Sequence, residues 1–200
     1  MMPALLVSRA REKRIRIWCS ACATGQEPYS LAMSLKGFGA ALAGWTVDIL
    51  ATDISNEVLT RAKAGLYNQF EVQRGLPIQN LVRFFSQVGE AWEIAPELRG
   101  MVQFRQFNLL NDFSVLGSFD VVFCRNVLIY FEQTTKIDVL NRLARQMASA
   151  GFLILGAAAP VVGLTEAFKP MPERRGLYVP RVPPSKPLPV SNVLKFAVKA

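Results

Sequence analysis

Short apolar runs alternate along the chain with segments whose apolar residues recur every three or four positions. The apolar runs predict strands over residues 15–19, 47–52, 102–107, 119–124, 152–155 and 177–179. Several, such as FDVVFC and GFLILG, are almost wholly apolar, which is typical of strands buried on both faces. Helical spacing predicts helices over 28–35, 56–64 and 134–148. This alternation indicates an α/β fold with a doubly wound, mostly parallel sheet.

Residues 67–101 interrupt the alternation. They contain a candidate helix over 78–85 and a candidate hairpin around 88–90, which predicts a small subdomain inserted between the second helix and the third strand. Five prolines between positions 180 and 189 disfavour regular structure there. We therefore expect one domain over 1–181, with 67–101 as an insertion, and a Pro-rich tail over 182–200 whose last residues are loosely held.

The composition and the first residues of the chain bear on where the protein resides, because they argue against a membrane span and a signal peptide. The 200 residues are 51% hydrophobic, yet no apolar run is long enough to cross a bilayer, so we expect no membrane insertion. The first residues, MMPALLVSRAREKR, place their charge after the apolar residues, whereas a signal peptide carries its charge first. These features favour a cytoplasmic protein.

The formal net charge of +8 is concentrated at the two ends of the chain. Residues 1–16 carry a net +4 and residues 170–200 a net +5, whereas 17–169 carry −1. Two interpretations stay open at this point: the ends are simply solvated, or they contact a polyanion or an acidic partner.

The chain has no histidine and three cysteines, which narrows the possible chemistry. The absence of histidine excludes Ser–His and Cys–His catalysis and most zinc sites. Cys19 and Cys22 form a C-x-x-C after a predicted strand, but three more residues follow before the helix, unlike a thioredoxin-type motif. With only Cys124 remaining, a four-ligand metal site lacks partners. We expect no metal and buried, reduced cysteines.

The loop after the first predicted strand, read as ACATGQEPYS, carries the most specific signal. A strand, a tight turn at Gly25 and a helix start bring backbone N–H groups to a ligand at the carboxyl end of a strand. Glu27 places a carboxylate where a phosphate-binding loop is neutral or basic. The loop has neither G-x-G-x-x-G nor a Walker lysine, which disfavours dinucleotides and nucleoside triphosphates. A nucleoside with a cationic tail, such as S-adenosylmethionine, suits it better.

Polar residues follow three further predicted strands, at the edge where open α/β sheets bind ligands. Asp53 can accept hydrogen bonds from ribose hydroxyls; the alternative is a helix cap, for which Ser55 is better placed. Asn108 can read an adenine edge or simply form a turn. Arg125 and Asn126 leave a buried strand and need a partner, which either a ligand or a local network supplies.

The motifs ATGQEPYSLAM, LATDISNEVLTRAKAGLY, FNLL and FDVVFCRNVLIYF occur in this order. Together they resemble the chemotaxis receptor methyltransferase family, CheR, over about residues 5–181. The resemblance implies a class I methyltransferase fold and transfer of a methyl group from S-adenosylmethionine to a receptor glutamate, with S-adenosylhomocysteine as product. By matched position, it implies a site made of Thr24, Glu27 (methionine amino group), Asp53 (ribose hydroxyls), Asn108 and Leu109 (adenine), and Arg125, Asn126 and Tyr130 (near the methyl group).

The residue types agree with this chemistry. A glutamate side chain is ionised at neutral pH, so the nucleophile needs no general base and the missing histidine is no obstacle. Arg125 is suited to orient the substrate carboxylate. Tyr130 either packs near the sulfonium by cation–π attraction or belongs to the core.

The chain also departs from the family pattern. Members have an N-terminal helical domain and a connecting segment that completes the pocket, whereas this chain begins in what resembles the last helix before the first strand. Gln26 stands where a glutamate is often seen. The hairpin SQVGEAWEI is short and lacks the glycine-rich extension of members that dock a receptor C-terminal pentapeptide, so we do not expect pentapeptide docking.

Three functions remain in competition. The first is a protein-glutamate O-methyltransferase acting on cytoplasmic helices of methyl-accepting chemotaxis receptors. The second is a regulatory module that binds the cofactor without turnover. The third, nucleic-acid methylation, is prompted by the basic ends, but DNA amino-methyltransferases place an Asn/Asp-Pro-Pro-aromatic turn where this chain has Arg-Asn-Val-Leu. We therefore expect no nucleic-acid partner.

Overall fold

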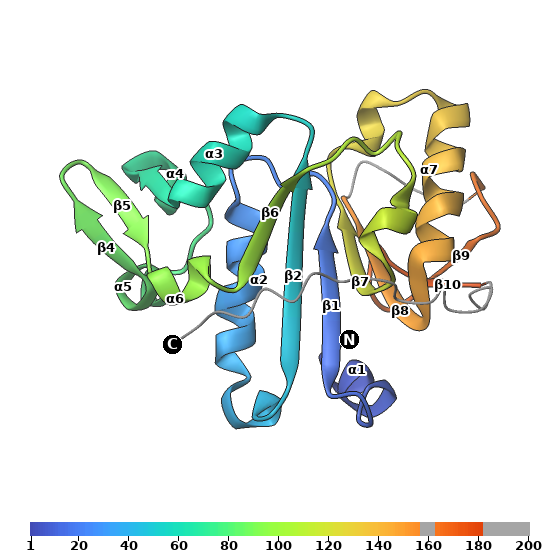
Figure 1. Cartoon of the computed structure of the whole chain (residues 1–200), viewed down its shortest axis with the longest axis horizontal. Helices are drawn as coiled ribbons and strands as arrows, with labels where there is room; N and C mark the ends of the chain where they lie inside the picture. Colours follow the sequence, from blue (N-terminus) through green and yellow to red (C-terminus); the bar gives the residue numbers. More distant parts are fainter. Residues whose placement is uncertain (157–162, 182–200) are drawn as a thin grey trace.

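The computed structural model describes residues 1–156 and 163–181, so the predicted tail over 182–200 lies outside the described residues. The main sheet has seven strands in the order β6-β2-β1-β7-β8-β10-β9 (Figure 1). Their bounds are β1 Arg14–Cys19, β2 Thr46–Asp53, β6 Val102–Gln106, β7 Phe119–Cys124, β8 Met147–Leu155, β9 Phe168–Pro170 and β10 Leu177–Pro180. The strands from β6 to β8 in this order run parallel, and β10 is antiparallel to both of its neighbours. The predicted α/β fold with a mostly parallel sheet is confirmed.

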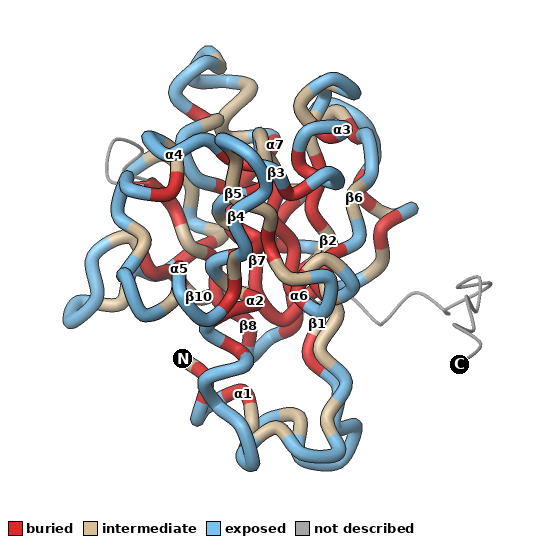
Figure 2. The backbone as a smooth tube through the Cα atoms, turned by 90° about the vertical axis from the view of Figure 1, so that its left-hand side faces the viewer, coloured by how far each residue is buried: buried red, intermediate tan, exposed pale blue. Residues whose placement is uncertain are grey.

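Helices cover both faces of this sheet. One face packs against α1 (Met2–Ser8), α2 (Gln26–Gly37) and α3 (Asn56–Ala64), and the other against α7 (Gln133–Gln146) and the 3₁₀ turn η2 (Phe113–Leu116). Successive strand residues point to opposite faces, so Ile17 packs in the first layer and Trp18 in the second. Figure 2 shows the buried residues concentrated along the central strands. Two further 3₁₀ turns are η1 (Gly39–Leu42) and η3 (Leu128–Tyr130).

A second, three-stranded antiparallel sheet lies between α3 and β6 in the sequence. Its order is β3-β5-β4, with bounds β3 Leu66–Asn68, β4 Phe85–Val88 and β5 Ala91–Ile94, and it carries the short helices α4 (Gln69–Gln73), α5 (Ile78–Phe84) and α6 (Pro96–Arg99). The helix and hairpin expected from the sequence are both present, whereas β3 was not expected. Tyr67, Phe84 and Ile94 join the same buried cluster as the α2 side of the main sheet. The small sheet is therefore packed onto the body of the protein rather than standing clear of it.

The predicted helix over 134–148 is wrong at its end. α7 stops at Gln146, and Met147 is extended and opens β8, where it pairs with Phe119. Met147 is fully buried at the start of β8, so the helical spacing of apolar residues continues past the end of the helix. β8 is consequently longer than the predicted strand over 152–155.

Three N-terminal arginines are bonded within the fold rather than only solvated. Asp120, which is buried, accepts hydrogen bonds from the Arg9 side chain at 2.5 Å and from the backbone N–H of Arg16 at 2.8 Å. The Arg16 guanidinium donates to two carbonyl oxygens of the turn before β7, at 2.8 and 2.9 Å. Arg14 pairs with Asp48 at 2.7 Å. Arg9 before β1 and Arg14 and Arg16 within it thus help to hold that strand in the sheet.

The three cysteines are free and buried, as the sequence predicted. Burial raises the pKa of Cys22 and of Cys124 to about 12, so both thiols stay protonated at neutral pH. Within residues 1–156 and 163–181, no group of three or more His, Cys, Asp or Glu side chains is placed to share a metal ion. None of the helices in that part of the chain has both the length and the apolar character that a bilayer crossing requires.

Candidate active site

The loop from β1 to α2 makes a tight turn at the carboxyl edge of the sheet. The N–H of Gly25 donates to the carbonyl of Cys22 at 2.9 Å, and Gly25 itself has φ +94° at the N-terminus of α2. A Cβ on Gly25 would lie 3.0 Å from the Cβ of Ala62 and 3.2 Å from the Tyr29 ring. Only glycine satisfies both the left-handed backbone and the close approach. The predicted turn is therefore built as expected.

Glu27 projects from the first turn of α2 and pairs with Arg125, which follows β7. The guanidinium Nη1 donates to Glu27 Oε1 at 2.8 Å. The Glu27 side chain is 19% exposed and that of Arg125 is 48% exposed. Burial raises the pKa of Glu27, and the hydrogen bond and charge of Arg125 oppose this shift. A mostly buried carboxylate, held by one cation with solvent access, is thus placed at the end of β1.

Asp53, at the end of β2, holds the β1–α2 loop in place. One carboxylate oxygen accepts the backbone N–H of Ala23 at 2.9 Å, and the other accepts the N–H of Ser55 at 3.1 Å. Each oxygen keeps a second lone pair, so the carboxylate can still accept hydrogen bonds from a diol. Ser55 caps α3 by accepting the N–H of Val58, as the sequence predicted. Because Ser55 is the N-cap of α3, helix capping does not explain the aspartate at position 53.

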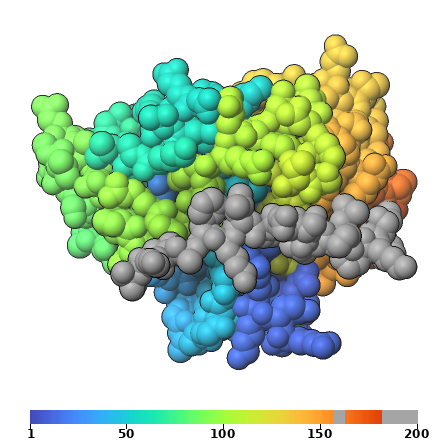
Figure 3. All heavy atoms as spheres, in the orientation of Figure 1, coloured from blue at the N-terminus to red at the C-terminus, as the bar shows by residue number. Residues whose placement is uncertain are grey.

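A pocket of about 500 Å³ opens beside the end of β6. Its lining includes Ile54, Gln106, Phe107, Asn108, Asn111 and Val115. Asn108 forms an Asx turn, because its Oδ1 accepts the N–H of Leu110 at 2.9 Å. In the space-filling view, the residues that follow β2 (teal) and those that follow β6 (lime) lie against each other along the upper face (Figure 3). Asn108 is thus both the turn former that the sequence allowed and part of a pocket wall.

The remaining residues that the resemblance places at the site differ in burial and environment: Leu109, Asn126 and Tyr130. Leu109 is 5% exposed and packs in the second core layer. Asn126 has φ +57°, and its Oδ1 would lie 2.4 Å from a Cβ on Gly156, so that glycine makes room for the asparagine side chain. Tyr130 is 80% exposed on η3, so the interpretation that it belongs to the core is wrong. Its ring is accessible from solvent, five residues after Arg125 in the sequence.

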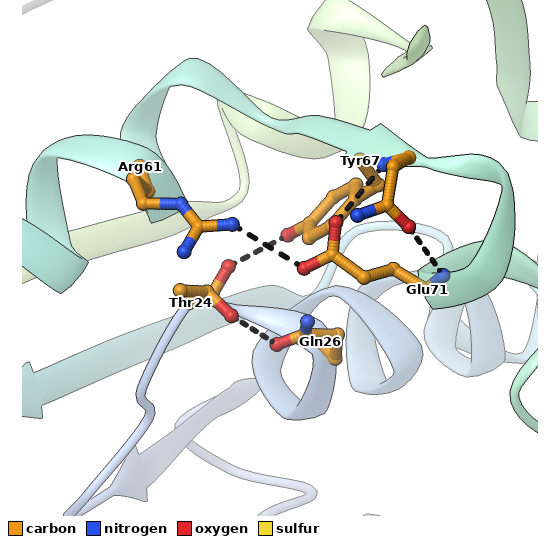
Figure 4. A network of polar contacts seen from close by, with 6 residues as sticks. Thr24, Gln26, Arg61, Tyr67 and Glu71 are labelled. Atoms are coloured by element: carbon orange, nitrogen blue, oxygen red, sulfur yellow. Dashed lines mark hydrogen bonds and ion pairs between the residues drawn. The ribbon is translucent and has the colours of Figure 1, made fainter.

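The small sheet reaches the β1–α2 loop through Tyr67. The Tyr67 hydroxyl donates to the carbonyl of Thr24 at 2.9 Å (Figure 4). The next residue after Tyr67 caps α4 in a reciprocal pair with Glu71, and Glu71 also meets Arg61 of α3 at 3.4 Å. Burial raises the pKa of Tyr67, so its hydroxyl remains a donor. The loop carbonyl at Thr24 therefore depends on a residue more than forty positions along the chain.

Replacing Tyr67 with phenylalanine should leave the fold intact and weaken ligand binding at the β1–α2 loop by about fivefold, because one hydrogen bond contributes about 1 kcal/mol. The ring, which is buried, would keep its packing. Tyr29→Phe is the matched control, since its hydroxyl donates instead to the carbonyl of Ala62 at 2.7 Å. Titration of both variants with S-adenosylhomocysteine measures the effect; equal affinities for the two would contradict a specific role of Tyr67.

Sequence reasoning missed several residues that shape the site. Tyr67 and Gly156 act through contacts between segments that are far apart in the sequence. Ile54 and Val115 are 63% and 62% exposed, and they line the pocket although neither belongs to a polar motif. Ile54 could have been found from the sequence, because an aliphatic residue directly after the acidic end of a strand is a candidate wall for a flat, apolar ligand.

The chain resembles known proteins both in sequence and in fold. Residues 1–177 match the family model described as CheR methyltransferase, SAM binding domain. Chemotaxis protein methyltransferase Cher2 of Pseudomonas putida is 41% identical over 161 residues, which cover 78% of this chain and 58% of the relative. Chemotaxis protein methyltransferase 1 of Pseudomonas aeruginosa is 42% identical over 175 residues, covering 84% of this chain and 63% of the relative.

The chain therefore spans about six-tenths of the length of these curated relatives. A solved TehB-like SAM-dependent methyltransferase from Corynebacterium glutamicum is 14% identical with a TM-score of 0.48, covering 88% of this chain and 84% of that one, a likeness too distant to bear on function. The family match and the two relatives agree with the resemblance that the four sequence motifs carry. This chain belongs to the CheR methyltransferase family, and S-adenosylmethionine is the cofactor of the domain that residues 1–177 match.

Proposed function

We propose that this chain is the catalytic domain of an S-adenosylmethionine-dependent methyltransferase that esterifies glutamate side chains on the cytoplasmic helices of chemotaxis receptors. The observation that carries the proposal is the Glu27–Arg125 pair at the carboxyl edge of β1 and β7. A mostly buried carboxylate at this edge suits an ammonium group, and a half-exposed guanidinium suits a carboxylate from outside. The proposal takes residues 1–181 as one domain, with 67–101 as its insertion.

The residues present fit the cofactor along its length. Glu27 would hold the methionine amino group, and the α2 N-terminus and Thr24 would lie beside the methionine portion. Asp53 has spare lone pairs for the ribose hydroxyls, and the pocket beside β6 has the polar rim and aliphatic walls that an adenine ring requires. The bound cofactor would supply a methyl group on a sulfonium, which passes to a carboxylate oxygen as the carbon–sulfur bond breaks and leaves a neutral thioether.

The contribution of the chain itself is orientation and charge. Arg125 would align the substrate carboxylate, and no side chain needs to remove a proton because the nucleophile is already ionised. Tyr130, which is 80% exposed, is available to contact the substrate segment. Attraction between an anionic nucleophile and a cationic donor strengthens as water leaves the site.

The relatives' names support a chemotaxis substrate, and a direct assay tests it. The chain is incubated with methyl-labelled S-adenosylmethionine and a receptor cytoplasmic fragment, and base-labile label is measured as released methanol. We expect base-labile label on the receptor fragment and none on DNA or RNA. Cofactor binding without ester on any fragment would favour the binding-only module, and base-stable label on nucleic acid would overturn the proposal.

A further inference from the structure

We propose that Arg142 of α7 is a positioning residue that sets the selectivity of the cofactor pocket for adenine. This inference rests on the proposed function, because it concerns the base end of the same cofactor site. Arg142 does not line the pocket beside β6. It acts on the segment that does, residues 107–112, which is called the base loop below.

Arg142 binds the base loop through two backbone carbonyls. Its Nη2 donates to the carbonyl of Leu109 at 2.9 Å, and its Nη1 donates to the carbonyl of Asn111 at 2.7 Å. The third donor, Nε, is held by Asp138 one helical turn earlier at 2.8 Å. The guanidinium also lies over the Phe113 ring, 4.4 Å from its centroid. One planar group is thus fixed on three edges and on one face.

The other polar contacts of the base loop are made within it, with β2 and, at Asp112, with Ser114 of η2, whose N–H and hydroxyl donate to the Asp112 carboxylate. Asn108 Oδ1 accepts the N–H of Leu110, and the carbonyl of Asn108 accepts the N–H of Asn111, both at 2.9 Å. At its start, the N–H of Phe107 donates to the carbonyl of Asp53 at 2.9 Å. These bonds shape the loop and fix where it begins. Asp112 ties the end of the loop to η2, and Arg142 ties the carbonyls of Leu109 and Asn111 to α7, so Arg142 contributes to the position of the pocket wall at Asn108 and Asn111.

A small shift in the position of that wall would alter the hydrogen bonds to the bound base. Asn108 and Asn111 both line the pocket. The carbonyl of Asn111 accepts a hydrogen bond from Arg142, and Asn108 precedes Leu109, whose carbonyl accepts the other. Hydrogen-bond recognition of a base edge depends on donors and acceptors placed to a fraction of an ångström, whereas aliphatic stacking tolerates movement. Loosening the loop should therefore harm discrimination between bases more than it harms binding in general.

Lysine cannot replace this arginine. Its ammonium is a point charge without the planar fork that reaches two carbonyls and a carboxylate at once. Arg142→Lys keeps the charge and the helix propensity of α7, while it removes at least one of the two ties to the base loop. Arg145→Lys, on an exposed position of the same helix, is the matched control.

The test compares two ligands that differ only at the base: S-adenosylhomocysteine and S-inosylhomocysteine, in which an oxo group replaces the 6-amino group. Calorimetry gives the ratio of their dissociation constants for the wild type, Arg142→Lys and Arg145→Lys. We expect the preference of the wild type for the adenine ligand to fall about fivefold in Arg142→Lys, the equivalent of one hydrogen bond, and to be unchanged in Arg145→Lys.

Asp138→Asn keeps the test decisive if Arg142→Lys is unstable. Asp138 is 62% exposed, so its replacement spares the core, and loss of this anchor should shift the preference in the same direction by a smaller factor. An unchanged preference in both folded variants would overturn the inference while leaving the proposed function intact. If the wild type does not bind S-adenosylhomocysteine at all, the result would instead contradict the proposed function.

Discussion

Replacing Asp53 with alanine will weaken the binding of S-adenosylmethionine by about 10- to 100-fold, because hydrogen bonds to a charged group contribute about 1.5–3 kcal/mol. Two losses combine. The ribose hydroxyls lose their acceptor, and the β1–α2 loop loses the bond from the Ala23 N–H to the Asp53 carboxylate at 2.9 Å. Calorimetric titration of the variant with the cofactor measures the sum.

Two companion variants separate these losses. Asp53→Asn keeps an oxygen that can accept a backbone N–H, so it should bind more tightly than Asp53→Ala yet less tightly than the wild type. Asp48→Ala removes another aspartate of β2, which lies about 16 Å from Asp53 along the strand and pairs with Arg14. Asp48→Ala should bind the cofactor normally. If Asp53→Ala does so too, Asp53 is no part of the site.

Glu27→Gln should lower the affinity for the cofactor without lowering the stability of the protein. Affinity for S-adenosylmethionine is expected to fall at least tenfold, because the ammonium loses its charged partner. The unfolding temperature of the ligand-free protein should stay the same or rise. Burial holds the pKa of Glu27 above its ordinary value despite Arg125, so the folded protein is not stabilised by ionising this group.

The same shift fixes how cofactor binding depends on pH. A carboxyl with a raised pKa in the folded state favours folding below its ordinary pKa, and this contribution is lost as the pH rises through the folded pKa. Binding of an ammonium needs the ionised form, so affinity should fall on acidification at a higher pH than for an ordinary glutamate. The Glu27→Gln variant should lack that dependence. A lower unfolding temperature in Glu27→Gln would show that the carboxylate has a structural role instead.

Local patterns predicted the parts of the fold that local physics determines. The strands 119–124 and 177–179 and the helix 56–64 were predicted nearly to the residue, because each has one dominant pattern and a turn residue at its boundary. Asp53 and Asn108 could be singled out because each is a polar residue at or just after the end of a strand, and Glu27 because it places a carboxylate at the helix start that follows the turn at Gly25. Parallel strands bring such residues to one edge of the sheet, and the structure places them there.

Contacts between distant segments were not predictable in the same way. Tyr67 reads as a core aromatic, and only the folded chain shows its hydroxyl on the carbonyl of Thr24. Arg142 reads as a solvated residue on the polar face of a helix, yet it donates to two carbonyls of the base loop. Neither contact leaves a periodicity or spacing signal, because each depends on how α7 or β3 packs against a loop from another part of the chain.

Binding of S-adenosylmethionine at the carboxyl edge of this sheet, through Glu27 and Asp53, is the step on which the proposed function depends. Its most direct test is calorimetric titration of the chain with S-adenosylmethionine and S-adenosylhomocysteine, run in parallel on the wild type and on Asp53→Ala. We expect one site per chain for both ligands, with affinity reduced 10-fold or more in the variant. No binding by the wild type, or equal binding by the two proteins, would contradict it.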